Sequence, residues 1–129
     1  MKKIAVLTSG GDAPGMNACV RAIVKSCIFK GIKPLGIYDG FQGMIEGRAQ
    51  ILNYSDVDNI IQRGGTILGT ARSEAFKLKE GRKKAIEFLS KQSIEGLIVI
   101  GGDGSFTGAH VLSGEMNIPI IGIPGTIDN

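Results

Sequence analysis

Several features that would assign this chain to a special class of proteins are missing from its sequence. No apolar run approaches the ~18 residues that a membrane-spanning helix requires, so no membrane partner is expected. Lys2 and Lys3 precede only a short apolar stretch, without the longer apolar segment of a signal peptide. The net charge of +3 is too small to indicate a nucleic-acid partner, although it is compatible with an anionic substrate. These absences favour a globular domain in solution.

Cysteine and histidine are also scarce. The two cysteines, Cys19 and Cys27, lie in one predicted helix. Because a helix rises ~1.5 Å per residue, the two thiols are ~12 Å apart, which is too far for a disulfide. Reduced thiols are typical of a cytosolic protein, and we expect a cytoplasmic location. The single histidine, His110, has no visible acidic partner and is assigned no role.

Glycine, in contrast, is abundant: 20 of the 129 residues are glycine, against a usual share of ~7%. Three glycine-containing segments follow predicted strands, namely Ser9-Gly10-Gly11-Asp12, Gly101–Ser105 and Pro124–Asn129. Glycine permits positive φ and a close approach of the backbone to a ligand. Its enrichment at strand ends therefore indicates contact with a ligand rather than disorder.

Apolar periodicity predicts alternating strands and helices in one domain. The predicted strands are Lys3–Thr8, Leu35–Tyr38, Leu97–Ile100 and Ile118–Ile123. The predicted helices are Gly15–Phe29 (ended by Gly31), Asp56–Gln62 (capped by Ser55), Glu80–Gln92 (with Arg82, Lys83 and Lys84 outward) and Phe106–Met116, with a loop at Gly64–Arg72. This order predicts an α/β fold of three layers, a Rossmann-like and mostly parallel sheet with helices on both faces. Ligands of such sheets bind at the carboxyl ends of the strands, so the three glycine-containing segments are expected to meet at one edge.

The segment Gly101–Ser105 has the composition of a phosphate site, because glycine N–H groups and a helix N-terminus attract anions. Asp103 adds a hard oxygen at which a magnesium ion could bridge phosphates. Gly11 is a second candidate for phosphate contact, although Gly10–Gly15 is also compatible with a tight turn between strand and helix. The sequence contains neither GxxxxGK[ST] nor GxGxxG, which excludes the Walker loop and the dinucleotide fingerprint.

Three further candidates each have two readings from the residues alone. Arg72 is either an ordinary surface arginine or a guanidinium that stabilises a transferring phosphoryl group. Thr126-Ile127-Asp128 is either a turn or a loop in which Asp128 acts as a general base. Arg21 and Lys25 share one helix face, which as a bare pattern is usually a solvated face.

The sequence resembles the amino-terminal part of the bacterial ATP-dependent 6-phosphofructokinases. The resemblance extends from end to end and is carried by Leu7–Asn17, Tyr38-Asp39-Gly40, Arg63–Thr66, Ile100–Ser105 and Ile123–Asn129. It implies a kinase of glycolysis that transfers the γ-phosphoryl group of magnesium ATP to the 1-hydroxyl group of fructose 6-phosphate, giving fructose 1,6-bisphosphate and ADP.

The resemblance also implies a role for each matching position. The implied ATP contacts are Gly11, Arg72, Ser73, Gly102, Asp103, Gly104 and Ser105, with Asp103 associated with Mg²⁺. Thr126, Ile127 and Asp128 match the substrate loop: Asp128 is the implied proton acceptor, and Thr126 and Arg72 assist the transfer. Arg21 and Lys25 match part of an effector site for ADP or phosphoenolpyruvate between the subunits of a homotetramer.

Some positions distinguish this chain within the family. Gly104 and Gly125 stand where pyrophosphate-dependent relatives tend to carry an acid and a lysine, and glycine at both positions favours ATP. Tyr54 and Asn59 replace an arginine and a serine of effector-responsive members, which weakens the expectation of anion regulation. Family subunits are also much longer than 129 residues. We therefore expect residues 1–129 to form an incomplete amino-terminal domain that binds ATP and Mg²⁺, lacks the sugar-phosphate-binding half and is inactive alone.

Two other functions remain open. The chain is also compatible with a nucleotide-binding module without turnover. Lipid and NAD kinases contain a similar GGDG core, but they do not combine it with the segments SGGDAPGMN and PGTIDN.

Overall fold

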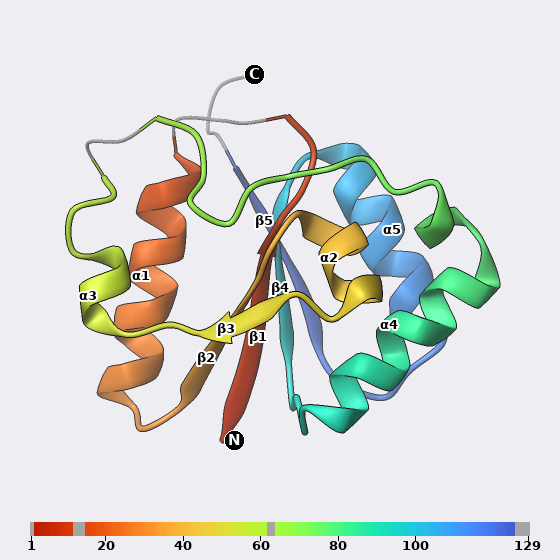
Figure 1. Cartoon of the computed structure of the whole chain (residues 1–129), viewed down its shortest axis with the longest axis horizontal. Coiled ribbons are helices and arrows are strands. Elements are labelled where there is room, and N and C mark those ends of the chain that lie inside the picture. The colour runs from red at the N-terminus through yellow and green to blue at the C-terminus, as the bar shows by residue number, and fades with distance from the viewer. Residues whose placement is uncertain (1, 12–14, 62–63, 126–129) are drawn as a thin grey trace.

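The fold was analysed in a computed structural model that describes residues 2–11, 15–61 and 64–125. Its centre is a sheet of five strands: β1 (Lys3–Thr8), β2 (Lys33–Ile37), β3 (Ala49–Ile51), β4 (Leu97–Gly101) and β5 (Ile120–Pro124). The strand order in the sheet is β3-β2-β1-β4-β5 (Figure 1). Neighbouring strands are parallel except for β3, which pairs antiparallel with β2 at one edge. The expected mostly parallel α/β sheet is thus confirmed.

Helices cover both faces of this sheet, as expected. One face packs against α1 (Met16–Phe29) and α3 (Tyr54–Val57). The other face packs against α2 (Gly40–Glu46), α4 (Lys79–Lys91), α5 (Asp103–Ser113) and the short 3₁₀ helix η1 (Ala75–Lys77). Figure 1 shows the two groups of helices on opposite sides of the strands.

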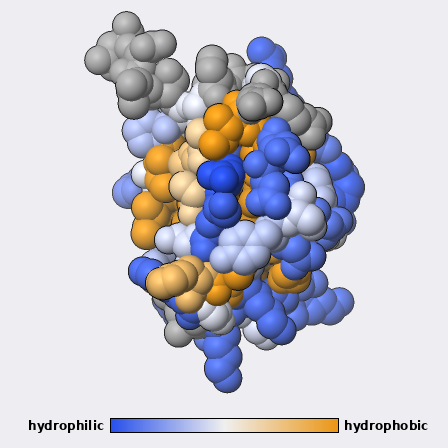
Figure 2. All heavy atoms as spheres, turned by 90° about the vertical axis from the view of Figure 1, so that its left-hand side faces the viewer, coloured by the Kyte–Doolittle hydropathy of each residue, from blue (hydrophilic) through white to orange (hydrophobic). Residues whose placement is uncertain are grey.

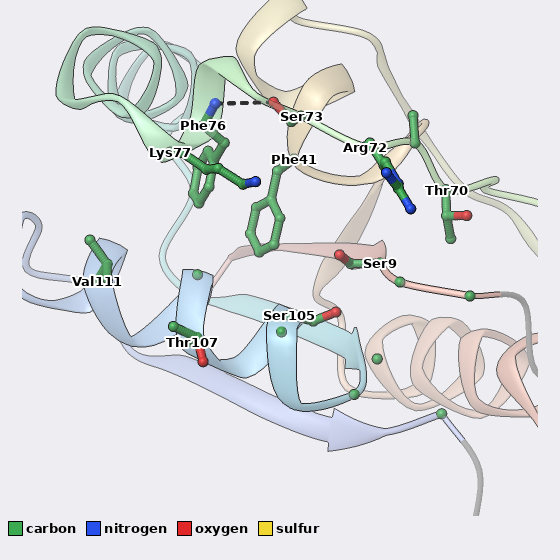
Figure 3. A pocket seen from close by; sticks show the side chains of 18 of the residues that line it. Ser9, Phe41, Thr70, Arg72, Ser73, Phe76, Lys77, Ser105, Thr107 and Val111 are labelled. Atoms are coloured by element: carbon green, nitrogen blue, oxygen red, sulfur yellow. Dashed lines mark hydrogen bonds between the residues drawn. The ribbon is translucent and has the colours of Figure 1, made fainter.

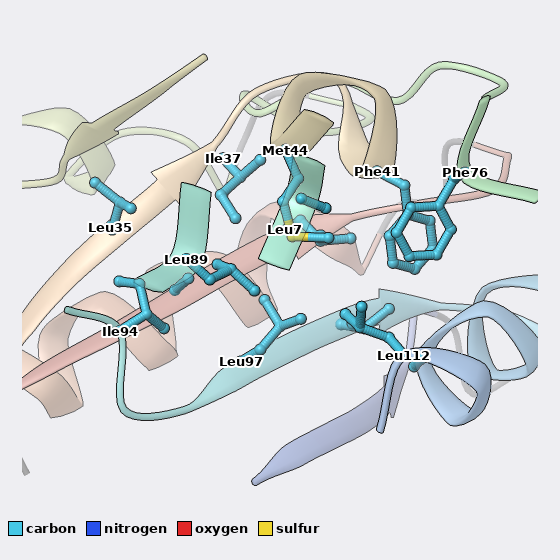
Figure 4. Packing of buried hydrophobic residues seen from close by; sticks show 14 residues of the cluster. Leu7, Leu35, Ile37, Phe41, Met44, Phe76, Leu89, Ile94, Leu97 and Leu112 are labelled. Carbon is cyan, nitrogen blue, oxygen red and sulfur yellow. The ribbon is translucent and has the colours of Figure 1, made fainter. Parts of the chain in front are cut away.

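The alternation of side chains along β1 divides the buried residues into two clusters. Ala5 and Leu7 point into the cluster with α2, α4 and α5, whereas Val6 between them points into the cluster with α1 and α3. Figure 4 shows Leu7 among side chains from β2, β4 and the covering helices. Because successive strand residues face opposite sides, one continuous apolar strand supports both cores.

Two helix ends bear on the predictions. α1 is followed by Gly31, whose φ of +74° is the left-handed conformation of a glycine after a helix, as expected. α5 begins at Asp103, three residues before the predicted start, with Gly102 in the N-cap position. The segment Asp103-Gly104-Ser105 is therefore the first turn of a helix rather than a loop before it.

Other predictions were wrong in detail. The predictions contained neither α2 nor β3, and α3 is four residues long and begins after Asn53, whose capping box with Asp56 replaces the expected cap at Ser55. α2 is short, and its packing against Tyr38 is a tertiary contact that helix propensity does not reveal. A Cβ at Gly43 would collide with the Tyr38 carbonyl group. Glycine at this position permits the close approach of α2 to Tyr38.

Candidate functional site

A cavity of about 1090 Å³ opens at the carboxyl ends of β1 and β4. One wall is formed by the residues after β1, the residues after β4 and the first two turns of α5. The opposite wall consists of Phe41 from α2, the segment Thr70–Ser73, and Phe76 and Lys77 from η1. Figure 3 shows these two walls facing each other. This is the strand edge at which a ligand was expected.

The backbone brings the glycine-containing segments together. The N–H group of Ser9 donates a hydrogen bond of 2.8 Å to the carbonyl oxygen of Ile100, and that of Gly125 donates one of 3.0 Å to Gly101. Ser9, Gly10 and Gly11 line the cavity together with Gly101, Gly102, Gly104 and Ser105. The expected meeting of the first two segments is confirmed. Gly125 lines the same cavity, while Thr126, Ile127 and Asp128 lie outside the described residues.

The glycines of the cavity fall into two classes. A Cβ on Gly101 would collide with Ser105 and with the Ser9 carbonyl oxygen, so the fold itself requires glycine there. A Cβ on Gly11, Gly102 or Gly104 would meet no atom within 4 Å, and none of the three has a positive φ. Glycine inside a helix costs ~0.5–1 kcal/mol relative to alanine, yet Gly104 lies in the first turn of α5. The absence of side chains at these three positions leaves space for a ligand against the backbone.

The first turn of α5 gives this wall its electrostatic character. The first N–H groups of a helix have no acceptor within the helix, and the helix dipole adds positive potential at that end. No side chain forms a capping hydrogen bond at Gly102. Two glycines beside these N–H groups allow an anion to approach them closely.

Asp103 is the expected metal ligand and lies exposed in the same turn. It is not among the residues that line the cavity, although its neighbours Gly102 and Gly104 are. Within residues 2–11, 15–61 and 64–125, no group of three or more His, Cys, Asp and Glu side chains is arranged to hold a metal ion. Mg²⁺ is commonly held by one or two carboxylates together with substrate phosphates, so a single carboxylate at this position fits that mode of binding.

The opposite wall combines aromatic rings with basic groups. Phe41 and Phe76 stack with their ring centroids 4.1 Å apart and an interplanar angle of 16°. The exposed side chains of Arg72 and Lys77 border the cavity beside them (Figure 3). The Ser73 hydroxyl group donates a hydrogen bond of 2.6 Å to Gln42. Phe41 and Phe76 are only 7% and 5% exposed, so this wall offers a small apolar area and two cations to a ligand whose anionic part lies at the glycines.

Arg82 corrects one prediction. It was expected on the outer face of its helix with Lys83 and Lys84, but its side chain is only 14% exposed and lines the cavity. Its guanidinium group bonds Glu115 at 2.6 Å and the carbonyl oxygen of Phe76 at 3.0 Å. The prediction failed because the acidic partner lies beyond α5, far away in the sequence. Lys83 and Lys84 are exposed as expected.

Arg21 and Lys25 lie on α1 and do not line the cavity. The Lys25 ammonium group lies 5.8 Å from the centroid of the Tyr54 ring, within reach of a cation–π interaction. The Nε atom of Arg21 is buried and has no hydrogen-bond partner among the described residues. The two candidate effector residues thus belong to a second region, on α1, where Lys25 lies near Tyr54 of α3.

The thiols of Cys19 and Cys27 are both free, as expected. Burial raises the pKa of each thiol above its ordinary value. Both are consequently kept in the less reactive thiol form at neutral pH, and nothing favours their use as nucleophiles.

Sequence reasoning missed the aromatic wall. Phe41 follows the turn Asp39-Gly40, and Phe76 follows the predicted loop, so no local pattern joins them. The sequence offered one hint: aromatic residues are few, with five phenylalanines, two tyrosines and no tryptophan, so each one is a candidate for a specific role. Aromatic residues in loops near a predicted site are therefore worth treating as candidates.

Comparisons with known proteins agree with this arrangement. A family model described as Phosphofructokinase matches residues 3–129. The chain is 61% identical over 129 residues to the ATP-dependent 6-phosphofructokinase of Thermoanaerobacter sp. (strain X514) and 59% identical to that of Thermotoga neapolitana, covering 100% of this chain and 40% of each relative. A solved structure of phosphofructokinase from Saccharomyces cerevisiae superposes with a TM-score of 0.94 at 39% identity, covering 99% of this chain and 20% of that one. In the described part of the chain, no helix combines the length and apolar character needed to cross a membrane.

Proposed function

The chain belongs to the phosphofructokinase family, and on that premise we propose that it is the ATP-binding segment of a glycolytic enzyme that phosphorylates fructose 6-phosphate. The observation that carries the proposal is the glycine wall: Gly11, Gly102 and Gly104 border the cavity, and their packing does not require glycine. Backbone N–H groups with open space before them suit the phosphates of a nucleotide. ATP as the donor is supported by the names of relatives that are 61% and 59% identical.

The two walls accommodate the two ends of ATP. The phosphates would lie against Gly11 and the first turn of α5, with Ser105 at the end of that turn. The base and ribose would lie along the apolar surface of Phe41 and Phe76, where Lys77 supplies a nearby cation. Ser73 holds this wall in place through its hydrogen bond to Gln42.

Asp103 is the residue that would hold Mg²⁺ together with the phosphate oxygens. The metal ion would neutralise charge on the β- and γ-phosphates when it is bound. Arg72 would balance the charge that develops on the migrating phosphoryl group, because a guanidinium group matches the geometry of phosphate oxygens.

The transfer itself needs a proton acceptor near the sugar. Asp128 takes the proton of the 1-hydroxyl group while that oxygen bonds to the γ-phosphorus. The bond from the γ-phosphorus to the bridging oxygen breaks, and ADP leaves with that oxygen. Thr126 would donate a hydrogen bond to the migrating group, and Ile127 would place both residues beside the sugar phosphate. The position of Gly125 in the wall of the cavity supports this assignment.

The chain spans 40% of the length of its curated relatives, so we propose that the sugar-phosphate site is completed by further residues of a longer protein. A homotetramer is part of the same proposal. Figure 2 looks onto the side that carries α1 and α3, where apolar side chains lie between hydrophilic ones. Phe29 is 86% exposed at the end of α1, and Tyr54 and Ile61 are also exposed. Exposed apolar groups of this kind support contact with another subunit.

Effector binding would occur at this second region. Arg21 and Lys25 are the cations that would bind ADP or phosphoenolpyruvate, and the buried, unpartnered Nε of Arg21 supports such a use. Tyr54 engages Lys25 without adding positive charge, which favours weaker anion binding than an arginine at this position would give. The reduced thiols of Cys19 and Cys27 support a cytoplasmic location.

The test is an assay of the complete protein that carries this chain. We expect formation of ADP from MgATP that depends on fructose 6-phosphate, together with binding of ATP in the absence of the sugar. Nucleotide binding without sugar-dependent turnover would instead identify a binding module. Failure to bind nucleotide would contradict the proposal as a whole.

The role of Asp128 gives the first specific prediction. Asp128→Ser in the complete protein removes the proton acceptor, and kcat should fall by ~10²–10⁴. The Kd for ATP should stay close to that of the unmodified protein, because the serine does not alter the glycine wall. Steady-state kinetics and calorimetry measure the two effects separately. Equal losses in kcat and in ATP affinity would remove the assigned role.

A further inference from the structure

The segment Thr70-Ala71-Arg72 borders the cavity, but none of its three residues forms a hydrogen bond with another described residue. Figure 3 shows Thr70 and Arg72 on the loop segment that passes above Ser9. An arginine that must meet a small phosphoryl group needs a fixed backbone. The position of Arg72 therefore depends on the anchors at either end of this short segment.

The anchor on the carboxyl side is Ser73. Its hydroxyl group donates to the Gln42 side chain at 2.6 Å and accepts a hydrogen bond of 3.1 Å from the N–H group of Phe76. Ser73 is thereby connected to both α2 and η1. One end of the segment is attached to the aromatic wall.

The anchor on the amino side is a chain of hydrogen bonds through two threonines. The Thr8 hydroxyl group donates to the carbonyl oxygen of Gly69 at 2.9 Å. Since a hydroxyl group has one proton to donate, the 3.0 Å contact between Thr8 and Thr66 must be a donation from Thr66 to Thr8. The Thr66 oxygen in turn accepts from the N–H group of Leu68 at 3.1 Å. Each hydroxyl group both donates and accepts, and neighbouring bonds of this kind strengthen one another.

Burial makes this chain of bonds more than a surface contact. Thr8 is 0% exposed at the end of β1, where a valine of nearly the same shape would pack equally well. A hydroxyl group at such a site costs free energy unless it is hydrogen-bonded, so its presence points to the loop that it holds. Two further bonds fix the same loop: Asp39 N–H to the Leu68 carbonyl oxygen at 2.8 Å, and Ile67 N–H to Asn17 Oδ1 at 2.7 Å.

We propose that the Thr8–Thr66 hydroxyl pair is a positioning device that ties residues 66–69 to the end of β1 and thereby places Arg72 over the cavity. Thr8 and Thr66 are positioning residues and do not touch the nucleotide. The attachment of residues 66–69 to β1, called the tether below, is supported by the hydrogen bonds alone. Its effect on turnover rests on the proposed function.

The test compares Thr8→Val and Thr66→Val with Thr8→Ser in the complete protein. Valine removes the hydroxyl group and keeps the branched shape, while serine keeps the hydroxyl group. Each valine variant should accelerate amide hydrogen exchange in residues 64–72, because the loop opens more often. Each should also lower kcat by ~10- to 10²-fold, since a small displacement of a positioned group has effects of this size.

Further readings separate positioning from general destabilisation. The KM for ATP should change by less than ~3-fold in the valine variants, because Thr8 and Thr66 do not contact the nucleotide. Thr8→Ser should keep both the exchange rates of residues 64–72 and kcat close to those of the unmodified protein. The losses in the double variant Thr8→Val/Thr66→Val should be smaller than the sum of the two single losses, since both single changes break the shared Thr8–Thr66 bond. Val24→Ala provides a matched control: it weakens the same apolar cluster that contains Leu68 of the loop but removes none of the loop's hydrogen bonds, and its kcat should be unchanged.

Each outcome decides the proposal. Unchanged exchange in residues 64–72 of Thr8→Val overturns the tether, and faster exchange with unchanged kcat overturns its role in placing Arg72. An equal loss of kcat in Val24→Ala would also overturn that role. Should the unmodified protein show no phosphoryl transfer, the proposed function fails, and the exchange comparison still supports or overturns the tether by itself.

Discussion

The glycines around the cavity differ in what the fold requires of them. Gly101 is enclosed by Ser105 and Ser9, and any side chain there would displace the backbone. Gly104 has open space where a side chain would lie and adopts an ordinary helical conformation. A substitution at Gly104 is therefore expected to change ligand binding without unfolding the protein.

This difference yields a prediction for Gly104→Asp. A carboxylate at this position would repel and crowd the phosphates of ATP, and the affinity for ATP should fall by tenfold or more, which is ~1.4 kcal/mol. Thermal stability should change little, because a Cβ at this position meets no atom within 4 Å and an acid is favourable in the first turn of a helix. Isothermal titration with ATP and a thermal unfolding scan measure the two quantities.

Gly104→Ala is the matched control. It adds only a methyl group, and alanine is the better helix former by ~0.5–1 kcal/mol, so unfolding should occur at a slightly higher temperature. ATP affinity should fall far less than with aspartate. If aspartate and alanine weakened ATP binding equally, charge repulsion at this position would be excluded.

Among the secondary-structure elements, α4 and α5 are joined by a partly buried ion pair that also supports the cavity. Arg82 from α4 binds Glu115, which follows α5, and its guanidinium group also reaches the Phe76 carbonyl oxygen. The two charged side chains are 14% and 25% exposed. Breaking one partner of such a pair leaves the other partly desolvated, which costs more than the loss of an exposed pair.

Glu115→Gln should therefore destabilise the protein by about 1 kcal/mol, in line with a hydrogen bond to a charged group that is partly screened by solvent. Glu74→Gln is the comparison, because its pair with Lys77 is exposed on both sides, and its effect should be within ~0.5 kcal/mol. Urea denaturation of both variants measures the difference. Equal stabilities would show that the α4–α5 pair contributes no more than a surface contact.

The elements also show what the sequence could and could not reveal. β1 and β4 are mostly apolar runs that lead into glycine-containing segments, and their positions were predictable to within a residue. β3 is three residues long at a sheet edge, and α2 depends on the contact of Gly43 with Tyr38, so neither carries a local signal. α3 was misplaced because Asn53 and Asp56 cap it together, whereas the predicted cap relied on Ser55 alone.

The candidate site divides in the same way. The meeting of Gly11 with Gly102, Gly104 and Ser105 at one cavity was predictable because the carboxyl ends of neighbouring parallel strands must share an edge. Phe41, Phe76 and Arg82 were not predictable, since their contacts join α2, η1, α4 and α5. Patterns along the chain locate one wall of a cavity, whereas the second wall requires tertiary structure.

In the whole molecule, a single sheet joins two candidate regions. Its carboxyl edge carries the cavity between the glycine wall and the aromatic wall. The face covered by α1 and α3 carries Arg21 and Lys25, with Tyr54 and Phe29 exposed nearby. β1 contributes to both regions, because its side chains point alternately into the two cores and its last residue, Thr8, reaches the loop before Arg72.

The most direct test of this account is a crystal structure of the complete protein with Mg²⁺ and a non-hydrolysable ATP analogue. We expect the phosphates within hydrogen-bond distance of the backbone N–H groups at Gly11 and Gly102–Ser105, with the adenine base against Phe41 and Phe76. The Asp128 carboxylate should lie in the same cavity. Phosphates bound away from both glycine segments, or an Asp128 carboxylate on the opposite side of the sheet, would contradict the account.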